Sequence, residues 1–165
     1  ARTGCGRVLD DPAFARGLRA LADRGLSFDL QLTVSQMPRV AALLADVPAL
    51  RVALCHAGSP WDRTTAGLAA WRRGLGALAA LPSCRCKLSG LSMFEPGWSP
   101  ESFAGIVRAS VDAFGIERCM FGSNFPVDGL HRRYAEIVEA THAAIAPYPS
   151  GEQHVFERCA REFYR

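Results

Sequence analysis

The sequence predicts an α/β fold in which parallel strands alternate with helices. Short apolar runs of strand length recur along the 165 residues, and each is followed by a segment with helical periodicity. Polar side chains also gather at one end of every predicted strand, while the residues at the opposite strand ends are apolar. Such alternation is typical of right-handed βαβ units on a parallel sheet.

The amino-terminal part of the chain starts this alternation. A helix is predicted over residues 12–24, and Gly25 follows it as a C-cap would. The short run SFDLQL, residues 27–32, is the first predicted strand. A second helix over residues 36–46 is broken by Pro48.

The second predicted strand, residues 51–56, carries a single imidazole at its end. Its residues are mostly apolar up to His56, and the small Gly58 follows before Pro60 stops the strand. A lone histidine after a parallel strand and before a glycine turn is typical of an α/β active site. The alternative is a core histidine that is hydrogen-bonded to the backbone.

The rest of the chain repeats the pattern, with breaks at Pro82 and Gly115 and with Ser99 as an N-cap before Pro100. In chain order, the remaining predicted elements are helix 64–81, strand 84–88, helix 100–114, strand 118–121, helix 131–145 and helix 152–164.

The polar residues at the strand ends predict one site, because the carboxyl ends of parallel strands meet at one edge of a sheet. In strand order they are Asp29 and Gln31, then His56, Trp61, Asp62 and Arg63, then Lys87, Ser89 and Ser92, and finally Ser123, Asn124 and Asp128. The helical His131, His142 and His154 are interpreted as surface or packing residues.

These side chains allow a limited chemistry. His56 can act as a base, polarise a carbonyl or bind one metal position, and Asn124 can donate to a developing oxyanion. Lys87 can balance a carboxylate or an oxyanion, or it can reach solvent with its stem on apolar surface. Asp128 is the acidic candidate near the last strand, or a loop-capping carboxylate. Trp61 offers a flat wall to a substrate, or it simply packs.

Composition excludes several functions. A net charge of +3 with scattered arginines does not favour nucleic acid, and no apolar run is long enough to span a bilayer. The six cysteines do not have zinc-site spacing. The first residues lack the apolar stretch of a signal peptide, so we expect a reducing, cytoplasmic setting. Without a starting Met, the chain is expected to be a piece of a longer protein.

The segments VALCHAGSPWDRTTAGLAAWRRG, CKLSGL, ERCMFGSNFPVDGL and FERCAREFYR together resemble the amidohydrolase-2 (amidohydrolase-related) family, from about residue 11 to residue 165. The resemblance implies a (β/α)8 TIM barrel and a metal-dependent hydrolase, or a lactonase for sugar or aromatic-acid lactones. It assigns the four predicted strands to strands five to eight of that barrel. Since a whole barrel needs about 250 residues, residues 1–165 would form one partial, carboxyl-terminal domain.

The same resemblance assigns roles to single residues. His56 matches the strand-six histidine, a metal ligand or substrate contact, and Lys87 and Ser89 match a K-x-S-G signature. Asn124 stands where many members carry an aspartate that binds metal and activates water. The family's H-x-H pair on barrel strand one has no counterpart here, and an amide is a poor ligand for a hard cation. The sequence therefore indicates a divalent metal (Zn or Mn) less strongly than the family resemblance alone would.

Two functions from different classes follow. The first is a hydrolase that opens a small cyclic ester. Its catalytic residues are then His56, Asn124 and Lys87, and its substrate contacts are Gln31, Trp61, Arg63, Ser89 and Asp128. The second is a truncated half-barrel that acts as an assembly or binding subunit and self-associates through open sheet edges. A flavodoxin-like domain is set aside, because no phosphate-binding glycine loop follows the first strand.

Overall fold

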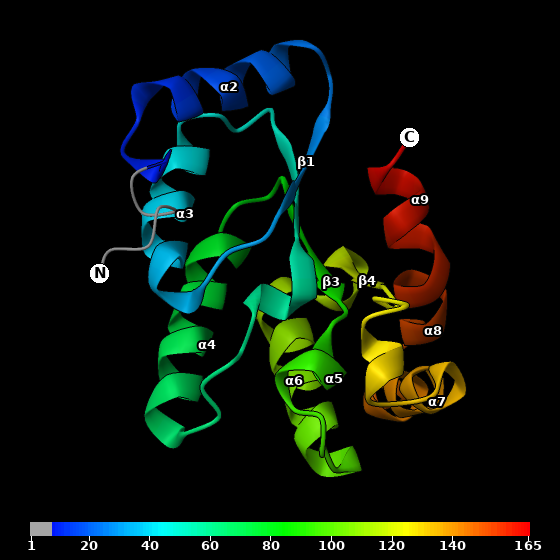
Figure 1. Cartoon of the computed structure of the whole chain (residues 1–165). Coiled ribbons are helices and arrows are strands. Elements are labelled where there is room, and N and C mark those ends of the chain that lie inside the picture. The colour runs from blue at the N-terminus through cyan, green and yellow to red at the C-terminus, as the bar shows by residue number, and fades with distance from the viewer. Residues whose placement is uncertain (1–7) are drawn as a thin grey trace.

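The computed structural model describes residues 8–165 and is centred on one parallel sheet (Figure 1). Its four strands stand in the order β1-β2-β3-β4, so each connection moves one position in the same direction. The strands are β1 (Ser27–Leu30), β2 (Arg51–Leu54), β3 (Cys84–Leu88) and β4 (Cys119–Phe121), and every neighbouring pair is parallel. The predicted α/β class with alternating strands and helices is confirmed.

Helices connect the strands and cover one side of the sheet (Figure 1). They begin at local caps: the Thr64 side chain accepts from the backbone of Gly67, and the Ser99 side chain accepts from that of Ser102. In chain order the longer helices are α2 (Pro12–Asp23), α3 (Met37–Ala45), α4 (Thr65–Ala79), α6 (Pro100–Phe114) and α7 (Tyr134–Ile145).

The two faces of the sheet have different surroundings. Along β3, Cys84, Cys86 and Leu88 are buried and belong to the main apolar core, which also contains Trp71 of α4 and Phe103 of α6. The alternating positions of β3 are only half-buried, as a strand with two different faces requires.

The carboxyl-terminal segment covers the other face of the sheet. It consists of α8 (Gly151–Gln153), a π-helical stretch (His154–Arg158) and α9 (Cys159–Phe163). Cys159 and Phe163 pack with Ala53 of β2 and Met120 of β4 in a second buried cluster. Figure 1 accordingly shows α9 across the sheet from α3 and α4.

Arg51 joins this segment to the beginning of the sheet. Its Nη1 donates to the carbonyl oxygens of Phe163 and Arg165, at 2.7 and 2.8 Å, and its Nη2 donates to that of Gly25 at 2.9 Å. One guanidinium therefore satisfies three carbonyls, one of which precedes β1 and two of which lie at or just after the end of α9.

Several predicted boundaries were wrong. Strand β2 ends at Leu54 and not at His56, because Cys55–Gly58 turn away from the sheet with His56 at φ 55° and Ala57 at φ 48°. Strand β1 ends at Leu30, two residues earlier than predicted.

Two helical regions also differ from the prediction. Helix α7 begins at Tyr134 rather than at residue 131, because a turn at Asp128–Leu130 comes first and the Glu136 side chain accepts from the backbone N–H of Arg133. The short helix α5 (Leu91–Phe94) directly after β3 was not predicted.

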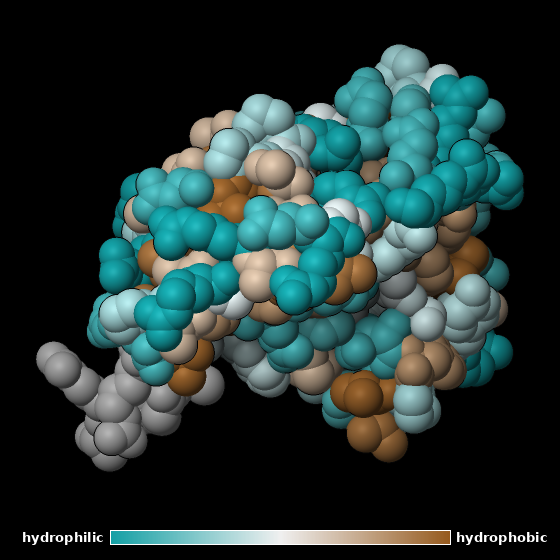
Figure 2. Space-filling model, turned by 90° about the horizontal axis from the view of Figure 1, so that it is seen from above, coloured by the Kyte–Doolittle hydropathy of each residue, from teal (hydrophilic) through white to brown (hydrophobic). Residues whose placement is uncertain are grey.

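Figure 2 views the molecule from the end where α2 and the carboxyl terminus lie. Hydrophilic residues predominate on this face, and the hydrophobic ones form small separate groups. Within residues 8–165, no helix combines the length and the hydropathy that crossing a bilayer requires. Cys5 lies outside the described residues, and the five other cysteines are free thiols.

Candidate functional site

His56 lies just beyond the carboxyl end of β2, in the turn that also contains Gly58. Its Nδ1 is 2.9 Å from the Oγ of Ser89, which follows β3. A non-glycine residue with positive φ costs on the order of 1 kcal/mol and persists only where its surroundings hold it. The turn therefore fixes the imidazole at the junction of two strand ends, as the sequence predicted for this edge of the sheet.

An aromatic pair lies beside this imidazole. The ring of Phe94 meets it edge-on at a centroid distance of 6.2 Å, and Trp61 packs edge-on against Phe94 at 4.6 Å. Trp61 nevertheless remains 58% exposed, so more than half of its surface is open to solvent. Trp61 thus packs and also offers an exposed aromatic surface near His56.

The environment favours a neutral imidazole. Burial lowers the pKa of His56 below its ordinary value, and Lys87 adds to this lowering, while the negative charge of Asp128 opposes it. Since Nδ1 contacts Ser89, Nε2 is the ring nitrogen left for a ligand. The influence of Asp128 also places that carboxylate within Coulombic reach of the ring.

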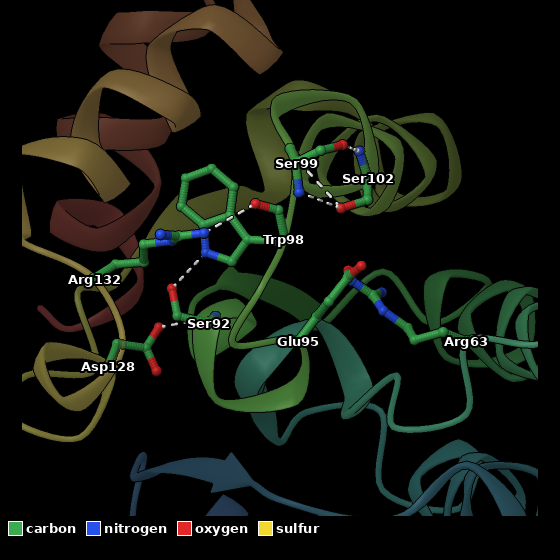
Figure 3. A network of polar contacts seen from close by, with 8 residues as sticks. All are labelled: Arg63, Ser92, Glu95, Trp98, Ser99, Ser102, Asp128 and Arg132. Atoms are coloured by element: carbon green, nitrogen blue, oxygen red, sulfur yellow. Dashed lines mark hydrogen bonds and ion pairs between the residues drawn. The ribbon is translucent and has the colours of Figure 1, made fainter.

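A second polar cluster follows β4 and is drawn in part in Figure 3. The Asn124 side chain donates from Nδ2 to Oδ1 of Asp128 at 2.8 Å, and the backbone N–H of Ser92 donates to Oδ2 at 3.3 Å. Asp128 is only 1% exposed. It therefore connects the loop after β4 to the start of α5, which follows β3.

Two residues that were not predicted complete this cluster. The Trp98 indole N–H donates to the hydroxyl of Ser92 at 2.9 Å. Arg132 lies over the Trp98 ring, 4.9 Å from its centroid, and donates from Nη2 to the Trp98 carbonyl at 3.2 Å (Figure 3). A sequence signal was present for Trp98, which stands in a turn-rich loop after a strand, whereas Arg132 is one of the scattered arginines.

Arg63, a predicted substrate contact, forms an ion pair with Glu95 (Figure 3). Both side chains are half-buried. The Nη1 atom of Arg63 is buried and has no hydrogen-bond partner within residues 8–165. Glu95, which fixes this arginine, was not predicted.

Lys87 lies on the sheet face that α9 covers. Its Nζ is 2.6 Å from Oδ2 of Asp29 in β1, and the hydroxyl of Tyr164 donates to Oδ1 of the same carboxylate at 2.7 Å. Burial lowers the pKa of Lys87, but hydrogen bonds to Asp29 and Tyr164 outweigh it, so the pKa lies above its ordinary value. Lys87 is therefore a paired cation whose charge still acts on His56.

Gln31 lies in a different environment from His56. It is exposed and lines a largely apolar pocket of about 200 Å³ with Phe14 of α2, Phe28 of β1 and Val40 of α3, among others. The structure thus brings His56, Ser89, Asn124 and Asp128 to one edge, while Gln31 faces a separate hollow.

A divalent metal does not fit the described residues by themselves. They contain no group of three or more His, Cys, Asp or Glu side chains that could hold an ion. Both oxygens of Asp128 accept hydrogen bonds, and His56 Nδ1 contacts Ser89, which leaves one imidazole nitrogen. Zinc sites in proteins need at least three protein ligands.

The fold and this edge define the class of protein: parallel βα units with an imidazole, an amide and a carboxylate at the strand ends. A family profile described as amidohydrolase matches residues 3–165. The chain therefore belongs to the amidohydrolase family.

Curated relatives agree with this assignment. The chain is 37% identical over 159 residues to the uncharacterized protein y4mH of Sinorhizobium fredii, covering 96% of this chain and 53% of that protein. It is 40% identical over 140 residues to an L-fucono-1,5-lactonase of Burkholderia multivorans, covering 78% of this chain and 47% of that protein. The chain thus spans about half the length of these curated relatives.

Solved structures give the same result for the fold. A crystal structure of an amidohydrolase from Burkholderia multivorans superposes with a TM-score of 0.87 at 33% identity, covering 94% of this chain and 58% of that one. Another crystal form of a Burkholderia multivorans amidohydrolase, with bound zinc, gives the same TM-score at 32% identity. The four parallel strands and their helices thus match about half of an amidohydrolase barrel.

Proposed function

We propose that the protein containing this chain hydrolyses a small cyclic ester, a sugar lactone or an aromatic-acid lactone. The observation that carries the proposal is the contact of His56 with Ser89 at one strand junction, within Coulombic reach of the carboxylate that holds Asn124. The curated lactonase similar to this chain supports the same substrate class.

In the proposed reaction, the oxygen of water bonds to the ring carbonyl carbon and an electron pair moves to the carbonyl oxygen. The electron pair then returns to re-form the carbonyl, the ring C–O bond breaks, and a proton of the attacking water passes to the departing ring oxygen. The hydroxy acid product ionises at neutral pH. The Ser89 hydroxyl donates a hydrogen bond to His56 Nδ1, so that Nε2 carries the proton of the neutral ring and donates a hydrogen bond to the oxyanion. Asn124 positions the water, and Lys87 contributes its positive charge.

The test is turnover of a lactone panel, measured as proton release by a pH indicator. Replacing His56 by Asn keeps a residue that tolerates positive φ, and we expect kcat to fall about 100-fold, as for loss of an oxyanion donor. His154→Ala, outside the strand ends, is the matched control and should retain wild-type turnover. Hydrolysis of no lactone by the wild type would overturn the proposal, and unchanged turnover in His56→Asn would remove His56 from it.

A second candidate is a non-catalytic assembly or binding subunit. It is favoured by β1 and β4, each of which pairs on one side only within the described sheet. Unpaired strand edges expose hydrogen-bonding groups to another chain, so this candidate predicts dimers or larger assemblies of residues 1–165. Light scattering across a wide concentration range measures this directly, and a monomer at every concentration would contradict it.

A further inference from the structure

The carboxylate of Asp128 is buried, and its contacts are unusual for a charged group. Both oxygens accept from N–H donors, one from the Asn124 side chain and one from the Ser92 backbone. It takes part in none of the ion pairs found among residues 8–165. A buried carboxylate is costly unless it is paired or hydrogen-bonded, so these two N–H groups account for its stability there.

The contact determines the orientation of the Asn124 amide. An ionised carboxylate oxygen only accepts hydrogen bonds, so the atom 2.8 Å from it must be the amide nitrogen. The backbone N–H of Asp128 also donates to the carbonyl of Asn124 at 3.1 Å, which closes the loop between them. The amide oxygen is therefore turned away from Asp128, and it accepts no hydrogen bond from the described residues.

This orientation gives Asn124 an acceptor role besides the donor role expected from the sequence. The sequence alone suggested a donor to the oxyanion, and one of the two amide N–H groups is committed to Asp128. The amide oxygen has no partner among the described residues, and it can accept a hydrogen bond from a donor such as water. Asn124 at φ 53° adopts a backbone conformation in which Asn and Asp are enriched, so the position suits either residue.

We propose that Asp128 is a positioning residue that holds Asn124 so that its amide oxygen accepts a hydrogen bond from the attacking water. The inference rests on the proposed lactone hydrolysis. Asp128 acts through Asn124 and touches neither substrate nor water. The hydrogen bond from water to the amide directs an oxygen lone pair of that water toward the ring carbonyl carbon.

Substitutions at these two positions should give an ordered series. Asp128→Leu removes both acceptors, and we expect kcat to fall at least tenfold with KM within twofold of wild type. Asp128→Asn keeps one acceptor oxygen, so its kcat should fall less than that of Asp128→Leu. The exchanged pair Asn124→Asp with Asp128→Asn restores an amide donating to a carboxylate and still presents an oxygen at position 124, so kcat should recover to within about fivefold of wild type.

The matched control is Asp112→Leu. Asp112 also accepts a 2.8 Å hydrogen bond, from the Tyr148 hydroxyl, but it lies on α6 and outside the strand ends. Its kcat should stay at the wild-type value. Wild-type kcat in Asp128→Leu would overturn the positioning role, and so would an exchanged pair that is no better than Asp128→Leu.

A second measurement does not depend on activity and covers the case in which Asp128→Leu fails to fold. In ¹⁵N-resolved NMR spectra, one side-chain amide proton of Asn124 should be shifted downfield in the wild type by its bond to the carboxylate. In the exchanged pair, that signal should belong to residue 128. If no lactone is hydrolysed, the proposed function is wrong, and the amide signal still reports whether Asp128 holds Asn124. An unshifted amide signal of Asn124 would by itself overturn the positioning role of Asp128.

Discussion

Gly90 leaves open the space that the His56 ring fills. A Cβ atom at position 90 would lie 2.7 Å from Nδ1 and 2.9 Å from Cγ of that ring, and the backbone of Gly90 has φ 68°. Both the space and the conformation therefore require glycine. The residue sits directly after Ser89, which contacts the same ring nitrogen.

We predict that Gly90→Ala displaces the imidazole and lowers the free energy of unfolding. The left-handed conformation alone costs a residue with Cβ about 1–2 kcal/mol, and the ring must also move out of the way. Chemical denaturation measures the loss, and lactone turnover should fall as well. Gly105→Ala is the matched control, because it lies within α6 with nothing within 4 Å, and it should stabilise the protein by about 0.5–1 kcal/mol. Equal stability of the two variants would contradict the steric argument.

The lowered pKa of His56 predicts a pH dependence of stability. Its cause is burial, with Lys87 adding to it and Asp128 opposing it. As the pH falls below about 6.5, the unfolded chain takes up a proton at this histidine while the folded chain does not. The unfolding free energy should therefore fall as the pH drops from that value towards the pKa of folded His56.

His56→Asn removes this titration and should make the stability profile flatter between pH 7 and pH 5. NMR titration of the imidazole checks the direction independently. A folded-state pKa above 6.5 would show that the burial argument is wrong.

The Lys87–Asp29 pair should contribute modestly to stability. Lys87 is 21% exposed and Asp29 is 46% exposed, so solvent screens the pair, and a double-mutant cycle with Lys87→Met and Asp29→Asn should give a coupling of about 0.5–1 kcal/mol. Because the pKa of Lys87 is raised, this contribution is complete below about pH 10 and is lost as the pH rises beyond the folded-state pKa. The exposed Glu157–Arg161 pair on the last helical segment is the control, with an expected coupling of about 0.3–0.5 kcal/mol.

The variant Lys87→Met also separates a structural from a catalytic role of Lys87. If it acts only through the pair that connects β1, β3 and Tyr164, Lys87→Met should keep turnover in proportion to its folded fraction. A loss of kcat far beyond the loss of folded protein would support the catalytic role that the family resemblance implied.

The strands and their polar ends could be predicted because burial imposes local patterns. The alternation in β3 and the apolar run before His56 are visible in the sequence. Strand β3 has its predicted bounds, and β2 begins where it was predicted but ends at Leu54. The turn at His56 could not be predicted, because its positive φ depends on contacts with residues distant in the sequence, including Ser89 and Gly90.

Contacts between residues that are far apart in the sequence could not be predicted from local patterns either. Tyr164 is separated from Asp29 by 135 residues, and Arg132 from Trp98 by 34, so neither contact leaves a periodic trace in the sequence. Asp128 was recognised as a candidate acid, but its hydrogen bond to Asn124 depends on how the loop between them folds back.

The guanidinium of Arg51 has a practical consequence for labelling. It holds the carbonyls of Phe163 and Arg165 beside the first residue of β2, at the end of the sheet opposite His56. In a protein made of residues 1–165, a fluorophore or affinity handle attached after Arg165 would start from that end. The immobilised or labelled protein should then leave the strand ends with the imidazole accessible to small molecules.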